Sequence, residues 1–282
     1  MRLSEVAPDL AKQTVADAVT IGVMSQPEDI CLLRHDGSGK NAFKNPLSFR
    51  YLDDNFIERD LKKTKDPRIH VYCSLKDGNT EFDKQFGLPN GYDSHTIADA
   101  PSGSFVGLEN TSNFNLNTIL RLDAPPIFLM PSETKLLLAE AVLRNWTNGN
   151  AEVLYKEAIT SSMKEQEIAY GTQGKITDEE IETYLAQNLL STANNTEKLQ
   201  IIGEQYWVAT FINGYESYAN WRRTGYPKLI PTNYSGSMSP GVIPTRLPYP
   251  TDEYSINRAN VDTANQQQGA DKVTTHIWWD ID

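Results

Sequence analysis

Apolar residues first recur at helical spacing near the amino terminus. Between residues 6 and 23 they return every four or five positions, at Val6, Leu10, Val15, Val19 and Val23. This spacing places them on one face of a helix, and Ser4 is a suitable residue to cap its start. We therefore expect one amphipathic helix over residues 6–23.

The helical pattern is lost between residues 26 and 117. Glycine and proline interrupt this segment repeatedly, and few apolar runs within it exceed three residues. Both residue types favour turns over regular elements. We interpret 26–117 as a long, loop-rich insertion with short strands, of which 69–74 is one candidate.

Helical order resumes with two helices over residues 132–145 and 151–169. Ser132 follows Pro131 and is a candidate N-cap for the first helix, while residues 148–150, Asn-Gly-Asn, predict a tight turn between the two. A short connection makes consecutive helices antiparallel neighbours. The two helices have the size of one tetratricopeptide-like unit, and one clear copy is visible in the pattern.

Two further helices are expected before residue 225. Thr177 and Glu180 have the spacing of a capping box and predict a helix to about Leu190. A longer helix is predicted from about Thr196 to Arg223. Its buried stripe would contain Leu199, Ile202, Trp207, Phe211, Tyr218 and Trp221.

The end of that long helix is well marked, and an extended tail follows it. Gly225 suits the left-handed position after a helix, and Pro227 prevents continuation. Residues 226–282 are rich in Pro, Gly, Asn and Gln, with one short helix possible over 262–268. We expect this tail to lie over the helices, pinned by Tyr249, Tyr254, Trp278 and Trp279. The chain is thus predicted to be all-α, with its helical core at 131–225.

Composition and charge exclude several classes of function. The 282 residues carry a net charge of −11 without a large basic cluster, which argues against nucleic-acid binding. No run of residues is apolar enough to cross a bilayer. The four histidines are scattered, and Cys31 and Cys73 are too far apart for a metal motif, so we expect no metal and no cofactor. Free buried thiols are the favoured interpretation of the cysteines, with a disulfide as the alternative.

Catalytic signatures are equally sparse. The sequence has neither a nucleophile elbow nor a zinc-hydrolase motif. Neighbouring carboxylates, such as Asp53 with Asp54 and Glu28 with Asp29, are interpreted as solvated or helix-starting charges. A glycosidase needs only two carboxylates from anywhere in the chain, so it stays open as a less favoured alternative.

Several motifs in the last 150 residues occur in the order found in one known family. They are Glu133 with Ala139-Glu140-Ala141 and Arg144, Trp221-Arg222-Arg223-Thr224-Gly225-Tyr226-Pro227, Arg246-Leu247-Pro248-Tyr249-Pro250, Glu253, Asn257, Asn260, Gly269, Asp271 and Trp278-Trp279-Asp280. Upstream, Asp66-Pro67-Arg68 is a further landmark. With them the chain resembles the SusD/RagB family of outer-membrane nutrient-binding proteins.

The resemblance implies a non-catalytic protein of tetratricopeptide-like helix pairs, held at the outer cell surface by a lipid anchor. Its expected role is to capture an oligosaccharide and deliver it to a SusC-like TonB-dependent transporter. A peptide, as in the RagB branch, is the alternative ligand. Family members are usually longer, so we expect the amino-terminal part and the anchor cysteine to be missing here. Helix faces that this part covers would then be exposed and would favour association.

The ligand site is expected within the loop-rich segment, because loops on a rigid scaffold commonly carry recognition. One glycine-rich stretch supplies aromatic and polar groups for stacking on sugar rings and bonding to hydroxyls. The candidate ligand-binding residues are Phe86, Asn90, Tyr92, Asp93 and His95. The alternative role for Phe86 and Tyr92 is to fasten the loop to the core.

Overall fold

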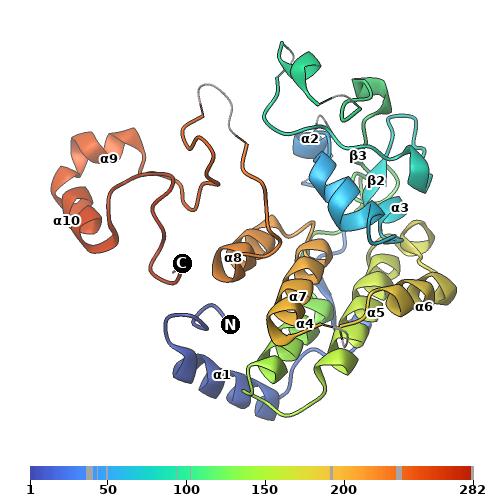
Figure 1. Ribbon diagram of the computed structural model, residues 1–282, viewed down its shortest axis with the longest axis horizontal. Helices are drawn as coiled ribbons and strands as arrows, with labels where there is room; N and C mark the ends of the chain where they lie inside the picture. The colour runs from blue at the N-terminus through green and yellow to red at the C-terminus, as the bar shows by residue number, and fades with distance from the viewer. Residues whose placement is uncertain are drawn as a thin grey trace.

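Two long helices, α4 (Pro131–Leu143) and α5 (Ala151–Tyr170), pack side by side as an antiparallel pair at the centre of the helical body (Figure 1). The computed structural model describes residues 1–35, 41–42, 44–48, 50–93, 95–101, 103–190, 193–232 and 237–280. Asn150 caps α5 by accepting the backbone N–H groups of Glu152 and Val153. The predicted helix pair is therefore confirmed.

The start of α4 differs from the prediction. Pro131 occupies the first turn, where a missing N–H costs no helical hydrogen bond, so Ser132 lies inside the helix and does not cap it. The Ser132 hydroxyl instead donates to the Glu165 carboxylate at 2.7 Å, which ties α4 to α5 in the interior.

The next helices are η6 (Gly171–Gly174) and α6 (Asp178–Gln187), and the capping box at α6 is confirmed. Thr177 N–H donates to the Glu180 carboxylate at 2.8 Å, and Glu180 N–H donates back to the Thr177 hydroxyl at 3.3 Å. Helix α7 (Asn195–Ala209) then packs against α4.

The single helix expected from Thr196 to Arg223 is wrong. The chain turns at 210–213 and starts a separate helix, α8 (Gly214–Thr224). The Ser217 hydroxyl donates to the Thr210 carbonyl at 2.8 Å and so stabilises this turn in place of a continuing helical ladder. Helix α8 ends as predicted, with Gly225 left-handed at φ 67°.

The segment 26–117 contributes to the core as well as to loops. Its elements are η1 (Pro27–Asp29), β1 (Cys31–Leu32), α2 (Lys44–Leu47), the π-type helix η2 (Phe56–Lys62), α3 (Ile69–Tyr72), β2 (Cys73–Ser74), η3 (Phe82–Lys84), η4 (Ile97–Asp99), η5 (Leu108–Asn110) and β3 (Asn113–Phe114). Strand β2 pairs antiparallel with β3, and β1 pairs with β4 (Ile127–Leu129). The strand expected over 69–74 is thus wrong for 69–72, which are helical.

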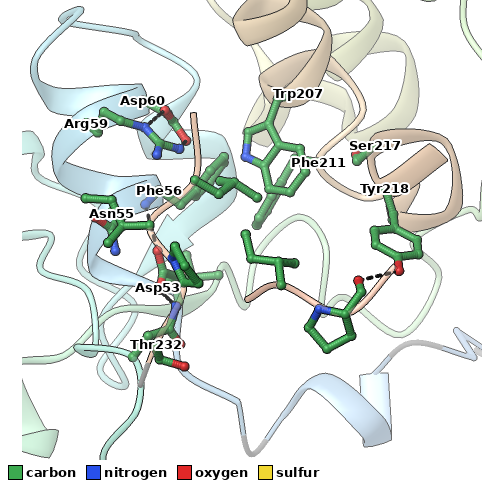
Figure 2. Close-up of a pocket in the computed structure, with 18 of the residues that line it drawn as sticks. Asp53, Asn55, Phe56, Arg59, Asp60, Trp207, Phe211, Ser217, Tyr218 and Thr232 are labelled. Carbon is green, nitrogen blue, oxygen red and sulfur yellow. Dashed lines mark hydrogen bonds and ion pairs between the residues drawn. The ribbon is translucent and has the colours of Figure 1, made fainter. Parts of the chain in front are cut away.

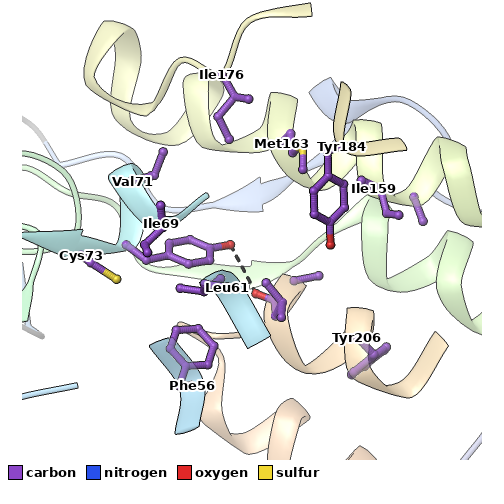
Figure 3. Close-up of a cluster of buried hydrophobic side chains, with 14 of the residues drawn as sticks. Phe56, Leu61, Ile69, Val71, Cys73, Ile159, Met163, Ile176, Tyr184 and Tyr206 are labelled. Carbon is purple, nitrogen blue, oxygen red and sulfur yellow. Dashed lines mark hydrogen bonds between the residues drawn. The ribbon is translucent and has the colours of Figure 1, made fainter. Parts of the chain in front are cut away.

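Side chains from this segment enter the main hydrophobic cluster. Ile57, Leu61 and Val71 have no exposed surface and meet Ile159 and Met163 of α5 in one cluster (Figure 3). The cysteines differ from each other, because Cys73 is buried in this cluster while Cys31 is exposed. Both thiols are free, so the prediction of burial is confirmed for Cys73 and wrong for Cys31.

Helix α1 (Pro8–Ile21) begins later than expected, and Ser4 does not cap it. The Ser4 hydroxyl instead donates to Glu5 and accepts a hydrogen bond from Arg223. Among the residues of α1, Ala11 is buried, whereas Leu10 and Val19 are largely exposed. The amphipathic pattern of this helix is therefore not matched by burial within this chain.

The tail forms a lobe beside α8 that contains α9 (Thr251–Ile256) and α10 (Arg258–Gln268) (Figure 1). Asp271 holds this lobe together by accepting hydrogen bonds from Arg246, the Tyr249 backbone and the Tyr254 hydroxyl. Trp279 lies against the Arg222 guanidinium at 4.7 Å, but Trp278 is 66 % exposed. The predicted pinning role of Trp278 is wrong.

None of the helices in the described ranges is long and apolar enough to cross a membrane. Among the same residues, no group of three or more acidic, His or Cys side chains is placed to hold a metal ion.

Candidate functional site

A cavity of about 650 Å³ lies between the helical body and the beginning of the tail. Its walls come from η2, the end of α7, α8 and two limbs of the tail, residues 229–232 and 237–244 (Figure 2). We call it the aromatic cleft. Ligand sites of this size are usually apolar with a few placed polar groups.

Aromatic rings form the floor of the cleft. The rings of Phe56 and Phe211 stack at 4.3 Å with an interplanar angle of 9°, and Phe114 lies 5.5 Å from Phe211. Trp207 and Tyr218 complete this lining from α7 and α8 (Figure 2). Because the stacked rings support one another, the half-buried face of Phe211 is held in a fixed orientation.

A ridge of two charged residues borders the cleft on the η2 side. Arg59 donates two hydrogen bonds to the Asp60 carboxylate, from Nε to Oδ1 at 2.6 Å and from Nη2 to Oδ2 at 2.7 Å. Its Nη1 donates to the Lys228 carbonyl at 3.2 Å. Burial raises the pKa of Asp60, and the hydrogen bonds from Arg59 oppose this effect. The ridge thereby links η2 to the start of the tail.

A second carboxylate lies at the other end of the lining. Asp53 accepts the Phe56 backbone N–H at 3.1 Å and is bonded by the Asn90 side-chain amide. Burial raises the pKa of Asp53, partly countered by the Phe56 hydrogen bond. Each carboxylate of the cleft is therefore already engaged by a neighbouring donor.

The tail limb that carries Pro244 is fixed to α8. The Tyr218 hydroxyl donates to the Pro244 carbonyl at 2.6 Å (Figure 2). The next residues are held as well, since Arg222 Nη1 donates to the Thr245 carbonyl at 2.9 Å. Helix α8 thus positions one wall of the cleft.

A family model described as "Starch-binding associating with outer membrane" matches residues 1–250 of the chain. The chain belongs to this SusD-like family. The resemblance found in the sequence motifs and the predicted all-α, tetratricopeptide-like fold are both confirmed. A comparison with curated proteins gives no match.

Solved structures, SusD homologues among them, share the fold. A chitin-binding protein is 29% identical, with a TM-score of 0.81 over 100% of this chain and 62% of its own. A chitin-binding SusD homologue from Flavobacterium johnsoniae is 25% identical, with a TM-score of 0.78 over 100% and 61%. A SusD homologue from Bacteroides fragilis is 24% identical, with a TM-score of 0.78 over 99% and 63%. This SusD-like chain thus spans about three fifths of the length of these three proteins.

Three of the residues predicted to bind ligand lie together in the SusD-like fold. Asn90, Tyr92 and Asp93 line a neighbouring cavity of about 850 Å³, which we call the outer cavity. Asn90 also lines the aromatic cleft, so it stands at the boundary between the two.

The other two predicted residues lie elsewhere. Lys62 places its Nζ 4.0 Å above the ring of Phe86, which lines neither cavity. His95 lines neither cavity; its side chain is 90% exposed, and its Nδ1 lies 3.8 Å from Asp93 Oδ1. The structure therefore brings Asn90, Tyr92 and Asp93 together and leaves Phe86 and His95 outside this group.

Sequence reasoning missed the aromatic residues of the cleft. Trp207, Phe211 and Tyr218 were assigned to the buried stripe of a long helix, but they are half-buried and face the cleft. The one available signal was the Asn213-Gly214 pair, which breaks the helix where these rings cluster.

Proposed function

We propose that this SusD-like chain captures an oligosaccharide in the aromatic cleft and releases it unchanged. The observation that carries this proposal is the set of fixed aromatic faces next to amide and charged groups in one cavity. A sugar ring has apolar faces that stack on aromatic rings, and its edge hydroxyls need hydrogen-bond partners. Asn55 and Arg59 are such partners on the η2 side.

The relatives support a ligand of the chitin type, since two of them are described as chitin-binding. An N-acetylglucosamine oligomer suits the cleft because its acetamido methyl groups are apolar while its ring edges are polar. The outer cavity, with Asn90, Tyr92 and Asp93, extends the proposed site beyond the cleft.

The hydrogen bonds already made by the two carboxylates of the cleft support binding without catalysis. Glycoside hydrolysis requires one carboxyl group as acid and another as base or nucleophile. Asp60 is held by Arg59, and Asp53 is held by Phe56 and Asn90. Neither group is left unengaged for proton transfer to a substrate, so the glycosidase alternative has less support.

Location and partner belong to the same proposal. The family description places its members at the outer membrane. We infer a cell-surface lipoprotein that delivers its oligosaccharide to a SusC-like TonB-dependent transporter, as the resemblance implies. Co-purification of the protein with such a transporter from outer membranes tests this part.

The binding proposal is tested by isothermal titration with chitooligosaccharides of two to six sugar units. Trp207→Ala should lower the affinity at least tenfold, because it removes the largest aromatic face of the cleft. Trp278→Ala is the matched control, since Trp278 lies exposed in the tail and outside the cleft. Equal losses in both variants, or binding of peptides but no glycan, would contradict the proposal, and new reducing ends would indicate a glycosidase.

A further inference from the structure

A third cavity, of about 600 Å³, lies on the far side of the Arg59–Asp60 ridge from the aromatic cleft. It is bounded by η2, by residues 187–189 after α6, and by α7. Four of its lining residues carry side-chain amides, namely Gln187, Asn188, Gln200 and Gln205. We call it the amide cavity. Its lining is suited to a ligand rich in hydroxyl and amide groups, since each amide offers both a donor and an acceptor.

One buried polar group of the amide cavity lacks a protein partner. Tyr155 lines it from α5 and is 1% exposed, and its side-chain hydroxyl forms no hydrogen bond to another group within the described part of the chain. Buried tyrosine hydroxyls normally have a partner, because an unpaired polar group in the interior is costly. The hydroxyl of Tyr155 is therefore available to a group that enters from the cavity.

The amide side chains of the cavity differ in whether their donors and acceptors are already bonded to other protein groups. Gln205 donates to Tyr184 and accepts from Arg68, and Asn188 donates to the carbonyls of Thr64 and Tyr184, so both are already engaged. Gln200 donates one N–H to Glu204 at 2.8 Å, which leaves its carbonyl oxygen unused within the described residues. Tyr155 and Gln200 thus offer a donor and an acceptor to a ligand.

The ridge connects this cavity to the cleft. Arg59 and Asp60 line both cavities, and the bond from Arg59 to the Lys228 carbonyl fixes their shared wall. Because the two cavities share this wall, an oligosaccharide longer than the cleft can place units on both sides of the ridge. We propose that the amide cavity is a second saccharide subsite, which takes the hydroxyl or acetamido groups of the following units of the same oligosaccharide.

This subsite rests on the proposed function, and the length dependence of binding separates the two. Isothermal titration measures the affinity of the unaltered protein, of Tyr155→Phe and of Gln200→Ala for the tri- and hexasaccharide of N-acetylglucosamine. The hexasaccharide should bind the unaltered protein more tightly than the trisaccharide. Each substitution should lower hexasaccharide affinity by about 2- to 12-fold, the range of one lost hydrogen bond, and change trisaccharide affinity less than 2-fold.

Tyr155→Phe keeps the buried ring, and Gln200→Ala changes a partly exposed position. The two substitutions therefore affect folding in different ways, and a loss of affinity in both is not explained by misfolding of one variant. Hexasaccharide affinity that is unchanged in both variants overturns the second subsite while leaving the proposed function intact. Losses of equal size at both lengths also overturn it, because the groups would then belong to the first subsite. Failure of the unaltered protein to bind either oligosaccharide overturns the proposed function and the subsite together.

Discussion

Arg68 and Asp66 form a two-point ion pair in which neither side chain has any exposed surface. Arg68 Nε lies 2.9 Å from Oδ1 and Nη2 lies 2.5 Å from Oδ2. The remaining guanidinium donors reach Ser162 of α5 and Gln205 of α7. The Asp66-Pro67-Arg68 motif therefore joins the segment before α3 to two helices of the body.

Arg68→Ala should destabilise the protein by about 3–5 kcal/mol, because it leaves the Asp66 carboxylate buried without its partner. Urea unfolding followed by circular dichroism measures the loss. The double variant Asp66→Leu with Arg68→Met removes both charges and should regain part of the stability. A double variant less stable than Arg68→Ala alone would contradict this account.

Glu140 of α4 is predicted to make the protein sensitive to acid. Burial raises the pKa of Glu140, but Arg223 and Arg144 outweigh this effect and hold it below its usual value. The folded state thus releases the proton more readily than the unfolded chain, so this stability is present above the ordinary Glu pKa and is lost as pH falls. Glu140→Gln should lower stability at pH 7 and flatten the acid limb of the unfolding profile, whereas the exposed Glu182→Gln should change neither.

Glu133, about two turns earlier on the same face of α4, is predicted to act in the opposite direction. Burial, together with the nearby Glu216 carboxylate, raises its pKa to about 8, and its Oε1 has no hydrogen-bond partner within the described chain. The folded state then keeps a proton that the unfolded chain releases. Between the ordinary Glu pKa and pH 8 stability should fall by up to about 1.4 kcal/mol per pH unit. Glu133→Gln should abolish that slope in thermal melts from pH 5 to 9, and an unchanged slope would contradict the prediction.

The two cysteines should react at very different rates. Cys31 is exposed, whereas Cys73 is fully buried, and burial raises the pKa of its thiol and disfavours the reactive thiolate. A thiol reagent such as DTNB should therefore modify one thiol in the native protein and two in urea. Cys31→Ser should abolish the native reaction, and rapid native labelling of that variant would contradict the assignment.

Two aromatic residues of the loop-rich segment should differ in their effect on oligosaccharide binding. Tyr92 lines the outer cavity, while Phe86 packs under Lys62 and lines neither that cavity nor the cleft. Tyr92→Ala should therefore weaken chitooligosaccharide binding several-fold in calorimetry, and Phe86→Ala should leave it unchanged. The reverse order of effects would exclude the outer cavity from the site.

Local signals in the sequence were sufficient where an element depends on neighbouring residues. The Thr177–Glu180 capping box and the left-handed Gly225 need no distant partner, and both were predicted. The break between α7 and α8 was not, because it depends on the bond from Ser217 back to Thr210, and the apolar spacing continues across it. Helical periodicity alone could not show the interruption.

The candidate site was harder to predict for a related reason. Asn90 and Tyr92 were selected because aromatic and polar residues follow each other in one short stretch, and both line the outer cavity. The rings of Trp207 and Phe211 are contributed by α7 and its end, where apolar spacing is the same for a core position and a cavity wall. The distinction depends on the tail limbs opposite, which are distant in sequence.

The two sides of the aromatic cleft differ in how well they tolerate substitutions that change ligand specificity. On one side Phe56 and Phe211 belong to, or pack on, the main hydrophobic cluster, so changes there disturb folding. On the other side the limbs 229–232 and 237–244 are irregular coil outside that cluster. Substitutions in these limbs can reshape the cleft at little thermodynamic penalty. Related proteins, or a designer, could therefore exchange the limbs to obtain new ligand preferences on an unaltered helical scaffold.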